Sequence, residues 1–269
     1  MIAALQMYDW PEVQGRLDAF WAILANELRK IDIDAPEELW RDADLATVWR
    51  SKDLLLGQTC GLPYVSGRCG ASRLLARPDF DLPGARGGTY SSALICRADD
   101  DAEELRGFAG RRAAINEYGS QSGCNALADA ILDLPRASTS PFFATVDISG
   151  AHRASADLVA AGDCDVAAID AVAWALYGKA EPRRHERLRV LQWTRPMPAL
   201  PFITAADDAG ERARLFQALA DAVKTSNEAP AGPPIPAGVT ETGDADYDPI
   251  RQMADRVAGM RLSPGSQPL

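Results

Sequence analysis

The stretch NEYGSQSGCNAL, residues 116–127, places small polar side chains between two glycines, directly ahead of an apolar run. The preceding AAIN predicts a buried strand and the following CNALADAIL a helix, so Ser120, Gln121 and Ser122 fall at a helix N-terminus. The first N–H groups of a helix lack intrahelical acceptors, and the helix dipole favours negative charge there. Small hydroxyls and flexible glycines would let a tetrahedral oxyanion approach this backbone. Plain N-capping by serine is the alternative, and the local sequence leaves both open.

Other phosphate and nucleophile sites fit this stretch less well. A hydrolase elbow requires Gly-x-Ser-x-Gly, and Gln121 stands where that serine would be. The candidates Ser122, His152 and Asp170 also depart from the Ser–Asp–His chain order of that fold. Other nucleophile arrangements stay open, because triads are recognised by geometry. The sequence has no Gly-x-x-x-x-Gly-Lys-Ser/Thr loop and no dinucleotide fingerprint after a strand.

Two titratable residues follow later in the chain. His152 stands in the first turn of a helix predicted to end at Gly162, where its imidazole could face a ligand. Asp170 ends the predicted strand DVAAID, where it could accept a proton from a ligand or cap the next helix. The chain has only two histidines, and its five scattered cysteines form no CxxC pair, so no metal site is expected. We expect free thiols in a reducing compartment.

Strands and helices alternate in the elements that must position these residues. Predicted strands are IAAL, DLLLGQ, YSSALICR, RRAAIN, DVAAID, RLRVLQWT and LPFITA; predicted helices lie in 9–30, 152–161, ERARLFQALADAVKT and YDPIRQMADRVAGMRL. This alternation predicts an α/β architecture with mixed, mostly parallel sheets flanked by helices. The Pro- and Gly-rich segment 227–246 is predicted to be irregular and on the surface.

The charge balance limits the partners. The chain carries 28 Lys and Arg against 38 Asp and Glu, a net charge of −10, which argues against nucleic acid or an anionic membrane. No apolar stretch approaches the roughly 20 residues of a membrane span, so no membrane insertion is expected. MIAALQMYDWPEV has no basic n-region and no long apolar h-region, so the sequence predicts no signal peptide.

Five stretches together resemble the periplasmic phosphonate- and phosphate-binding components of ABC transporters, in the type 2 periplasmic-binding-protein superfamily. They are LLLGQTCGLPYV, GTYSSALICR, LRGFAGRRAAINEYGSQSGCNAL, SGAHRASADLVAAGDCDVAAIDAVAW and LPFITA, within roughly residues 1–205 and in the family's order; YDPIRQMADRVAGM is similar to its terminal helix. The resemblance implies two α/β lobes joined by a hinge that close over a small oxyanion, such as phosphonate or phosphate, in an interlobe cleft. Lobe 1 would comprise residues 1–93 and 197–269, including segment 227–246 and the C-terminal helix, and lobe 2 residues 94–196.

The resemblance also implies which residues contact the ligand. They are Thr59 and Tyr64 in the first lobe, Tyr90, Ser91 and Ser92 near the hinge, and Ser120, Gln121, Ser122, His152 and Asp170 in the second lobe. No cofactor, metal or catalytic residue is implied, and N–H dipoles and hydroxyls would hold the anion without Lys or Arg. Two residues depart from the family pattern. Gln121 replaces a threonine, which would shrink the pocket and add an amide, and Arg153 replaces an aspartate.

The leading hypothesis is a solute-binding protein for a small anion, with an ABC-transporter permease or a signalling protein as its partner. Since no signal peptide is predicted, we expect a cytoplasmic relative of a typically periplasmic family. One alternative is a cytoplasmic enzyme on the same fold that uses His152 and Asp170 as acid and base. A structural or interaction protein is the other.

Overall fold

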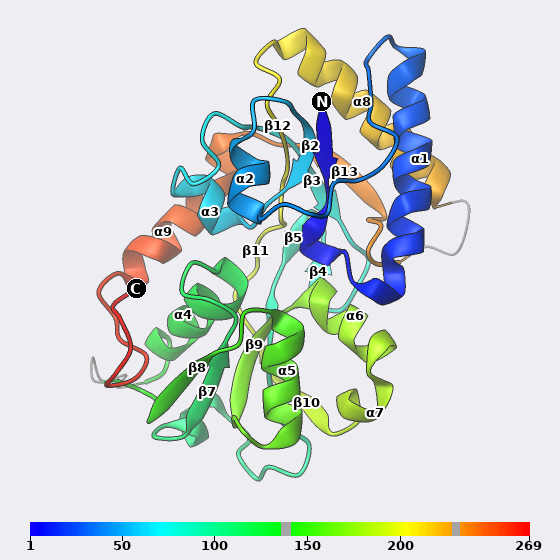
Figure 1. Cartoon of the computed structure of the whole chain (residues 1–269). Helices are drawn as coiled ribbons and strands as arrows, with labels where there is room; N and C mark the ends of the chain where they lie inside the picture. Colours follow the sequence, from blue (N-terminus) through cyan, green and yellow to red (C-terminus); the bar gives the residue numbers. More distant parts are fainter. Residues whose placement is uncertain (136–140, 228–231) are drawn as a thin grey trace. The chain divides into compact units, whose positions relative to one another are not determined.

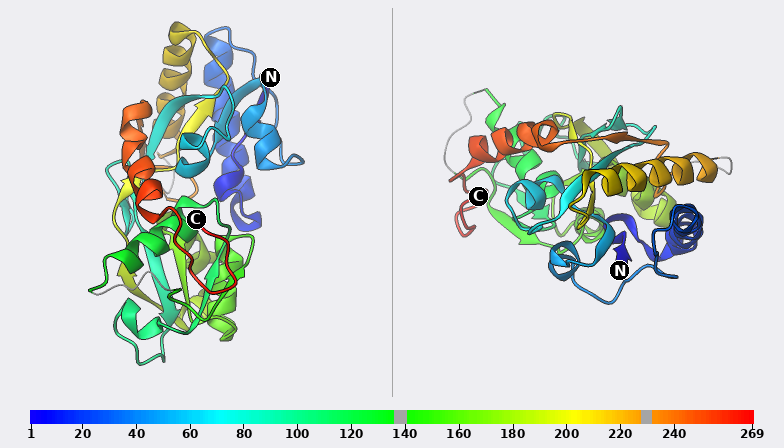
Figure 2. Two further views of the ribbon diagram at one scale, coloured as in Figure 1. Left: turned by 90° about the vertical axis from the view of Figure 1, so that its left-hand side faces the viewer. Right: turned by 90° about the horizontal axis from the view of Figure 1, so that it is seen from above.

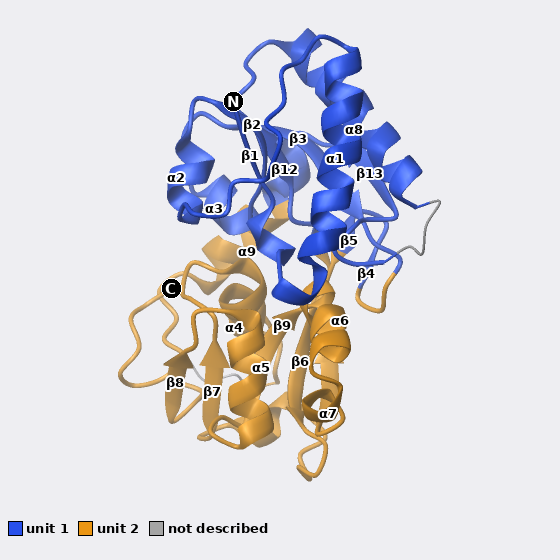
Figure 3. Cartoon of the chain, turned by 45° about the vertical axis from the view of Figure 1, so that its right-hand side comes forward, with its two compact units in different colours: residues 1–81, 85–89, 198–248 blue, residues 82–84, 90–197, 249–269 orange. Residues whose placement is uncertain are grey.

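The computed structural model describes residues 1–135, 141–227 and 232–269. The chain forms two compact units (Figure 3): unit 1 is residues 1–81, 85–89 and 198–248, and unit 2 is residues 82–84, 90–197 and 249–269. The main crossings lie after residues 89 and 197, close to the expected 93 and 196. The C-terminal segment corrects the sequence-based assignment, because residues 249–269 pack with unit 2 and not with lobe 1. Val257 and Leu262 are buried in the core of unit 2, which accounts for this placement.

Unit 1 is built on a five-stranded sheet with the order β1-β2-β12-β3-β13 (Figure 1). Its strands are β1 (Ile2–Ala4), β2 (Leu54–Gln58), β12 (Phe202–Thr204), β3 (Arg73–Asp79) and β13 (Gly238–Glu241). β1 and β2 are parallel, whereas β12 is antiparallel to both β2 and β3. β2 and β3 therefore point the same way, and the carboxyl ends of β1, β2 and β3 lie at one edge of the sheet.

Two long amphipathic helices cover this sheet. α1 (Gln14–Lys30) and α8 (Ala209–Ser226) lie side by side in all three views of Figures 1 and 2. Their buried residues recur at helical spacing and form the core with β2 and β3: Leu17, Phe20, Trp21, Leu24, Leu28, Leu215, Leu219 and Val223. The unit also contains η1 (Gln6–Tyr8), η2 (Pro11–Val13), α2 (Leu45–Arg50), α3 (Gly61–Val65) and η5 (Asp244–Tyr247).

The Pro- and Gly-rich segment 227–246 is more regular than predicted. β13 lies within it and pairs antiparallel with β3, and η5 begins within it. The turn-forming residues flank β13, and the strand itself completes the edge of the sheet beside β3. Residues 228–231 of the segment lie outside the described residues.

Unit 2 contains a second five-stranded sheet, with the order β10-β6-β9-β7-β8. Its strands are β10 (Leu188–Trp193), β6 (Ser92–Arg97), β9 (Val166–Asp170), β7 (Arg112–Ile115) and β8 (Thr145–Ile148). β7 is parallel to both β8 and β9, whereas β6 is antiparallel to both β9 and β10. The mixed α/β architecture is confirmed, but antiparallel pairs are more frequent than predicted. The strands that adjoin the crossings, β6, β10 and β12, run against their neighbours.

Helices cover both faces of this sheet. α4 (Ala126–Leu132) packs on the face formed by Leu94, Ala113 and Val166, and α5 (His152–Ala161) packs across β6, β7 and β9 (Figure 1). The predicted end of α5 is confirmed, because Gly162 adopts a φ of 84° as its C-cap. The unit also contains η3 (Leu105–Phe108), η4 (Gln121–Asn125), α6 (Ala171–Ala180), α7 (Pro182–His185) and α9 (Asp248–Val257).

A small third sheet lies where the chain passes between the units. It has the order β11-β5-β4 and consists of β11 (Met197–Pro198), β5 (Thr89–Tyr90) and β4 (Ala85–Arg86). Gly84, just before β4, has a φ of +77°, and a Cβ placed there would lie 2.2 Å from the ring of Trp193. Both observations explain why a glycine precedes this sheet.

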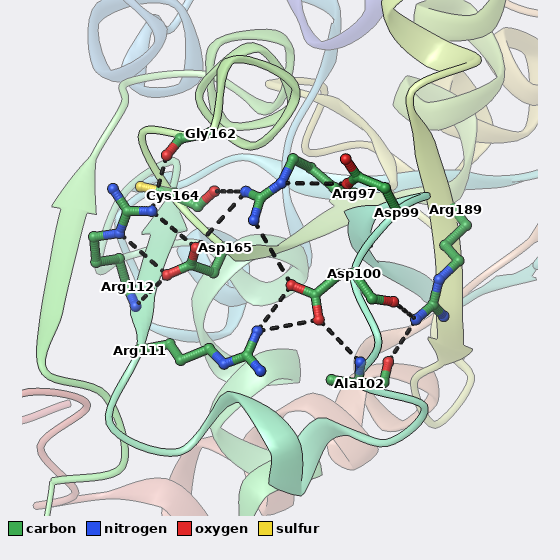
Figure 4. A network of polar contacts seen from close by, with 10 residues as sticks. All are labelled: Arg97, Asp99, Asp100, Ala102, Arg111, Arg112, Gly162, Cys164, Asp165 and Arg189. Carbon is green, nitrogen blue, oxygen red and sulfur yellow. Dashed lines mark hydrogen bonds and ion pairs between the residues drawn. The ribbon is translucent and has the colours of Figure 1, made fainter.

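An arginine–aspartate network holds together one end of the sheet of unit 2 (Figure 4). Arg112, at the start of β7, donates from Nη2 to Oδ1 of Asp165 at 2.8 Å and from Nε to Oδ2 at 3.1 Å. Arg111 donates from Nη1 to Oδ2 of Asp100 at 2.8 Å, and Arg97 lies 3.7 Å from both carboxylates. Burial raises the pKa of Asp165, but the hydrogen bonds and charge of Arg112 outweigh burial and lower it.

Asp165→Asn should therefore destabilise the chain, with a fall in Tm of roughly 2–4 °C at neutral pH. The pKa of Asp165 is lower in the folded chain than in the unfolded chain. Its contribution to the free energy of unfolding is therefore complete above the unfolded-state pKa and is lost as the pH falls through the folded-state pKa. Thermal unfolding at neutral and acid pH checks this, and the difference from wild type should shrink in acid. Asp99→Asn is the control, since Asp99 is exposed and lies 3.6 Å from Arg97. An equal effect of both variants would contradict the prediction.

Candidate functional site

Polar residues gather at the other end of the sheet of unit 2. Asn116 follows β7, His152 begins the helix after β8, and Asp170 ends β9. Ser92 opens the antiparallel strand β6 and is paired with Asp170 in the sheet register. Ligands of open α/β sheets bind outside the carboxyl ends of parallel strands, so this is the expected edge for a site.

The stretch from residue 118 to 124 is a helix start, as predicted. η4 is a π-helical turn that leads into α4, and Ser120 is its N-cap. The Ser120 Oγ accepts the N–H of Gly123 at 3.0 Å, and the Ser120 carbonyl accepts the N–H groups of Cys124 and Asn125. The N–H groups of Gln121 and Ser122 precede these and lie at the open end of the helix, where intrahelical acceptors end. Serine capping is thus confirmed, and it leaves two N–H groups for another acceptor.

Hydrogen bonds link Ser92, Ser120, Ser122 and His152. The Ser122 Oγ lies 2.7 Å from Nε2 of His152 and 3.4 Å from the Ser120 Oγ. The Ser92 Oγ donates to the carbonyl of Ser122 at 2.8 Å. The three serines are buried. The structure therefore brings four of the predicted ligand residues together around the first turn of η4.

His152 is neutral in this environment. Burial lowers the pKa of its imidazole from 6.5 to about 4, and the backbone of Ala168 offsets this only in part. A neutral imidazole has one donor and one acceptor nitrogen. When Nε2 carries the proton, it donates to the Ser122 Oγ, and the hydroxyl proton of Ser122 is then available to an anion. His152 can thus orient Ser122 without adding charge.

Asn116 is a site residue that the sequence interpretation did not single out. A Cβ at Gly123 would lie 1.9 Å from the Asn116 Oδ1 and 3.3 Å from Cε1 of His152. Gly123 is therefore needed so that the Asn116 amide and the imidazole can pack directly on the η4 backbone. The signal was present in the sequence, because Asn116 is the first polar residue after the buried strand that precedes the serines.

Three other predicted residues of unit 2 have identifiable roles in the fold. Asp170 caps α6, since its Oδ1 accepts the N–H groups of Val172 at 2.8 Å and Ala173 at 3.0 Å. Ser91 donates its N–H to Gly84 at 2.6 Å, and Tyr90 is buried in β5. The capping interpretation of Asp170 is confirmed, and ligand contacts of Tyr90, Ser91 and Asp170 stay predictions.

Thr59 and Tyr64 belong to unit 1. Thr59 is buried after β2, and its Oγ1 donates to the Cys60 carbonyl at 3.2 Å. Tyr64 lies in the short helix α3, and its hydroxyl donates to Oδ1 of Asp244 at 2.7 Å. Burial, followed by this hydrogen bond, raises the pKa of Tyr64. A cleft shared by these residues and those of unit 2 stays a prediction.

The model of one protein family, described as "ABC transporter, phosphonate, periplasmic substrate-binding protein", matches residues 14–247. The chain belongs to this family. The predicted family and its solute-binding class are thereby confirmed. No curated protein matches the chain.

Solved structures of similar fold agree with this family. XAC2383 from Xanthomonas citri bound to ATP has a TM-score of 0.69 at 16% identity, with 95% of each chain covered. PhnD1 from Prochlorococcus marinus in complex with methylphosphonate has a TM-score of 0.68 at 18% identity, with 90% of this chain and 93% of that chain covered. The periplasmic aliphatic sulphonate binding protein SsuA from Escherichia coli has a TM-score of 0.58 at 16% identity, with 95% of this chain and 90% of that chain covered. At these identities the likeness shows the two-lobed binding-protein fold.

The two departures from the pattern of this substrate-binding family have structural partners. The buried amide of Gln121 donates from Nε2 to Sδ of Met253 in α9 at 2.8 Å. The side-chain amide of Gln121 is thus engaged by α9 of the same unit. Arg153 donates from Nη2 to Oε1 of Glu181 at 2.5 Å, at the end of α6.

Metal ligands and membrane spans are not found in the described ranges. Residues 1–135, 141–227 and 232–269 contain no group of three or more His, Cys, Asp or Glu side chains that could hold a metal ion. All five cysteines are free and buried. No helix in these ranges has the length and apolar character needed to cross a bilayer.

Proposed function

We propose that this chain binds a small oxyanion of the phosphonate class at the first turn of η4, as the substrate-binding component of an ABC transporter. One observation carries the proposal: the Ser122 Oγ lies 2.7 Å from His152 Nε2, beside the capped N-terminus of η4. This arrangement offers two backbone N–H groups and oriented hydroxyls in a buried setting. Such donors stabilise the tetrahedral oxygens of a phosphonate. The family model supports the ligand class.

The electrostatics of unit 2 fit an anion bound by dipoles. The whole chain carries a net charge of −10, so the global field disfavours an anion. The neutral imidazole of His152 adds no charge, and Arg153 is paired with Glu181. Hydroxyls, N–H groups and the dipole of the helix are then the local groups that favour negative charge.

Titration calorimetry with methylphosphonate, inorganic phosphate, phosphite and methanesulfonate tests the proposal. Wild-type protein should bind at least one of these anions, and Ser122→Ala should weaken it roughly tenfold to a hundredfold, the effect of one charge-assisted hydrogen bond. Ser120→Ala should act in the same direction. Ser51→Ala is a matched control, because the Ser51 Oγ accepts only the local N–H of Asp53 in unit 1. Binding of none of the four anions, or wild-type affinity in both site variants, would refute the site.

The partner and the location are part of this proposal. A permease of an ABC transporter is the partner that the family description supports. Binding to such a permease would require export, whereas the sequence predicts no signal peptide and a cytoplasmic location. Cell fractionation decides between the two locations. Hinge closure also stays a prediction, and a fall in the radius of gyration on addition of the ligand would support it.

A further inference from the structure

Asn116 follows β7 directly, at the edge of the sheet of unit 2 where the site residues gather. Its main-chain carbonyl accepts the N–H of Gly150, in the loop before α5, at 2.9 Å. Its side chain packs on the first turn of η4, because a Cβ placed at Gly123 would lie 1.9 Å from the Asn116 Oδ1. The same Cβ would lie 3.3 Å from Cε1 of His152. The amide of Asn116 is therefore held next to the two helix starts that carry Ser122 and His152, within one unit.

The surroundings of this amide decide which of its ends points inward. Oδ1 is buried and has no hydrogen-bond donor within the described residues. The main chain of Gly123 lies against it, and Cε1 of His152 is nearby. C–H groups form weak favourable contacts with an oxygen, whereas an NH2 group in this place would be a buried donor without an acceptor, which is the rarer and costlier case. Oδ1 therefore lies inward, and Nδ2 points away from Gly123.

The NH2 group of Asn116 is a free donor beside the N-terminus of η4. In the ranges 1–135, 141–227 and 232–269, Nδ2 makes no hydrogen bond and is not among the buried unpaired atoms, so it reaches solvent. The other two carboxamides of residues 116–125 are engaged. Asn125 donates from Nδ2 to Oε1 of Gln121 at 3.5 Å, and Gln121 donates from Nε2 to Sδ of Met253 at 2.8 Å. Asn116 thus offers a donor that no described residue uses.

An NH2 group differs from the hydroxyls of the site in what it can bind. A serine hydroxyl donates or accepts, whereas the NH2 group of a carboxamide only donates. A ligand oxygen that faces Nδ2 must then be an acceptor, so an ionised oxygen fits there and the hydrogen of a protonated oxygen does not. Hydrogen bonds to ionised acceptors are about twice as strong as those between neutral groups. The NH2 group therefore favours an ionised ligand, in a chain whose net charge of −10 opposes it.

We infer that the side-chain amide of Asn116 donates from Nδ2 to an ionised oxygen of the bound anion, and that Asn116 is a specificity-determining residue of the site. The inference deepens the proposed function and rests on it. Asn116, Ser120 and Ser122 all belong to unit 2, so one unit supplies these donors.

The titratable groups on the elements around Asn116 leave the protonation of the ligand as the quantity that pH changes near neutrality. His152 of α5 stays neutral above its pKa of about 4, and burial raises the pKa of the Cys124 thiol in η4 to about 12. Asp170 of β9 is engaged in the cap of α6, and Glu117, next to Asn116 in the chain, is exposed.

Isothermal titration of Asn116→Ala and Asn116→Asp with methylphosphonate, inorganic phosphate, phosphite and methanesulfonate tests the inference. At about pH 8, Asn116→Ala should weaken binding roughly tenfold or more, the effect of a hydrogen bond to a charged group. Asn116→Asp keeps the size of the side chain and should weaken binding further, because its carboxylate faces the anion. Asn26→Asp is the matched control, since it adds the same charge on the exposed face of α1 in unit 1 and should bind close to wild type.

The pH dependence of Asn116→Asp is a second readout, which a packing role would not produce. Phosphonates and phosphates take up a proton between about pH 8 and about pH 6, whereas methanesulfonate stays ionised throughout. The carboxylate of the variant can accept a hydrogen bond from a protonated oxygen. Asn116→Asp should therefore regain affinity for methylphosphonate and inorganic phosphate at about pH 6, but not for methanesulfonate.

The outcomes separate this inference from the proposed function. Wild-type affinity in Asn116→Ala, with weakened binding in Ser122→Ala, overturns the role of Asn116 and leaves the site standing. Binding of none of the four anions by the wild-type protein overturns both. If Asn116→Ala lowers Tm strongly, the pH dependence of Asn116→Asp decides the matter. A loss of affinity for methylphosphonate or phosphate in Asn116→Asp that is the same at both pH values shows a packing role and refutes the inference.

Discussion

Replacing Arg256 with glutamine should lower the free energy of unfolding by about 2 kcal/mol, between the values for exposed and for fully buried ion pairs, because the Arg256 side chain is 36% exposed. Arg256 of α9 donates from Nη1 to Oδ1 of Asp129 and from Nη2 to Oδ1 of Asp133 at 2.7 Å. The side chain of Asp129 is only 3% exposed, so its carboxylate cannot regain water when Arg256 is removed. Arg195 remains at 3.4 Å from Asp129 and limits the loss of stability.

Urea unfolding of a small variant set measures this effect. Arg195→Gln is the matched control, because Arg195 contacts the same two aspartates at longer distances and is 52% exposed. Arg195→Gln should lower the free energy of unfolding by well under 1 kcal/mol, as is usual for exposed ion pairs. The double variant Arg256→Gln with Asp129→Asn should recover part of the stability, since no unpaired buried charge is left. A midpoint for Arg256→Gln equal to that of Arg195→Gln would contradict the prediction.

The Arg256 pair also bears on the ligand site. Asp129 lies on α4, which continues directly from η4, and Met253 of the same α9 accepts the amide N–H of Gln121. α9 therefore holds the helix that presents Ser120 and Ser122 from two points. We expect Arg256→Gln to weaken anion binding as well as stability, whereas Arg195→Gln should affect neither strongly.

The parts of the fold that sequence reasoning found are those with a local signal. The strand before Asn116, the helix start at Ser120 and the end of α5 at Gly162 each depend on residues within a few positions of one another. The same holds for the cap of α6 by Asp170. Polar residues after buried strands were enough to indicate the edge of the sheet where a site would lie.

What sequence reasoning missed depends on residues far apart in the chain. The assignment of residues 249–269 to unit 2 follows from burial of Val257 and Leu262, which no local pattern announces. The partner of Gln121 is 132 positions away, and the burial of Asp129 beside Arg256 of α9 appears only when the two helices are placed. An amide or a guanidinium has the same local pattern whether it contacts a ligand or another helix. Tertiary contacts decide between the two.

His152 should make the stability of the folded chain fall as the pH decreases from 6.5 to about 4. Its folded-state pKa is lowered to about 4 by burial, against 6.5 for a free imidazole. Below pH 6.5 His152 binds a proton in the unfolded chain but stays neutral in the folded chain. Its contribution to the free energy of unfolding is therefore complete above pH 6.5 and declines below it. The loss is about 1.4 kcal/mol per pH unit, or about 3 kcal/mol over the interval.

Thermal unfolding of wild type and His152→Gln across this interval measures the effect, and the variant should show the flatter slope. The glutamine amide can still reach Ser122, so the slope separates the titration from the hydrogen bond. Burial also lowers the pKa of His185, and His185→Gln removes that contribution as a control. With only two histidines, proton NMR titration assigns both pKa values directly. A His152 that titrates near 6.5 would mean that its imidazole is solvated, and the neutral Ser122–His152 pair would then lose its basis.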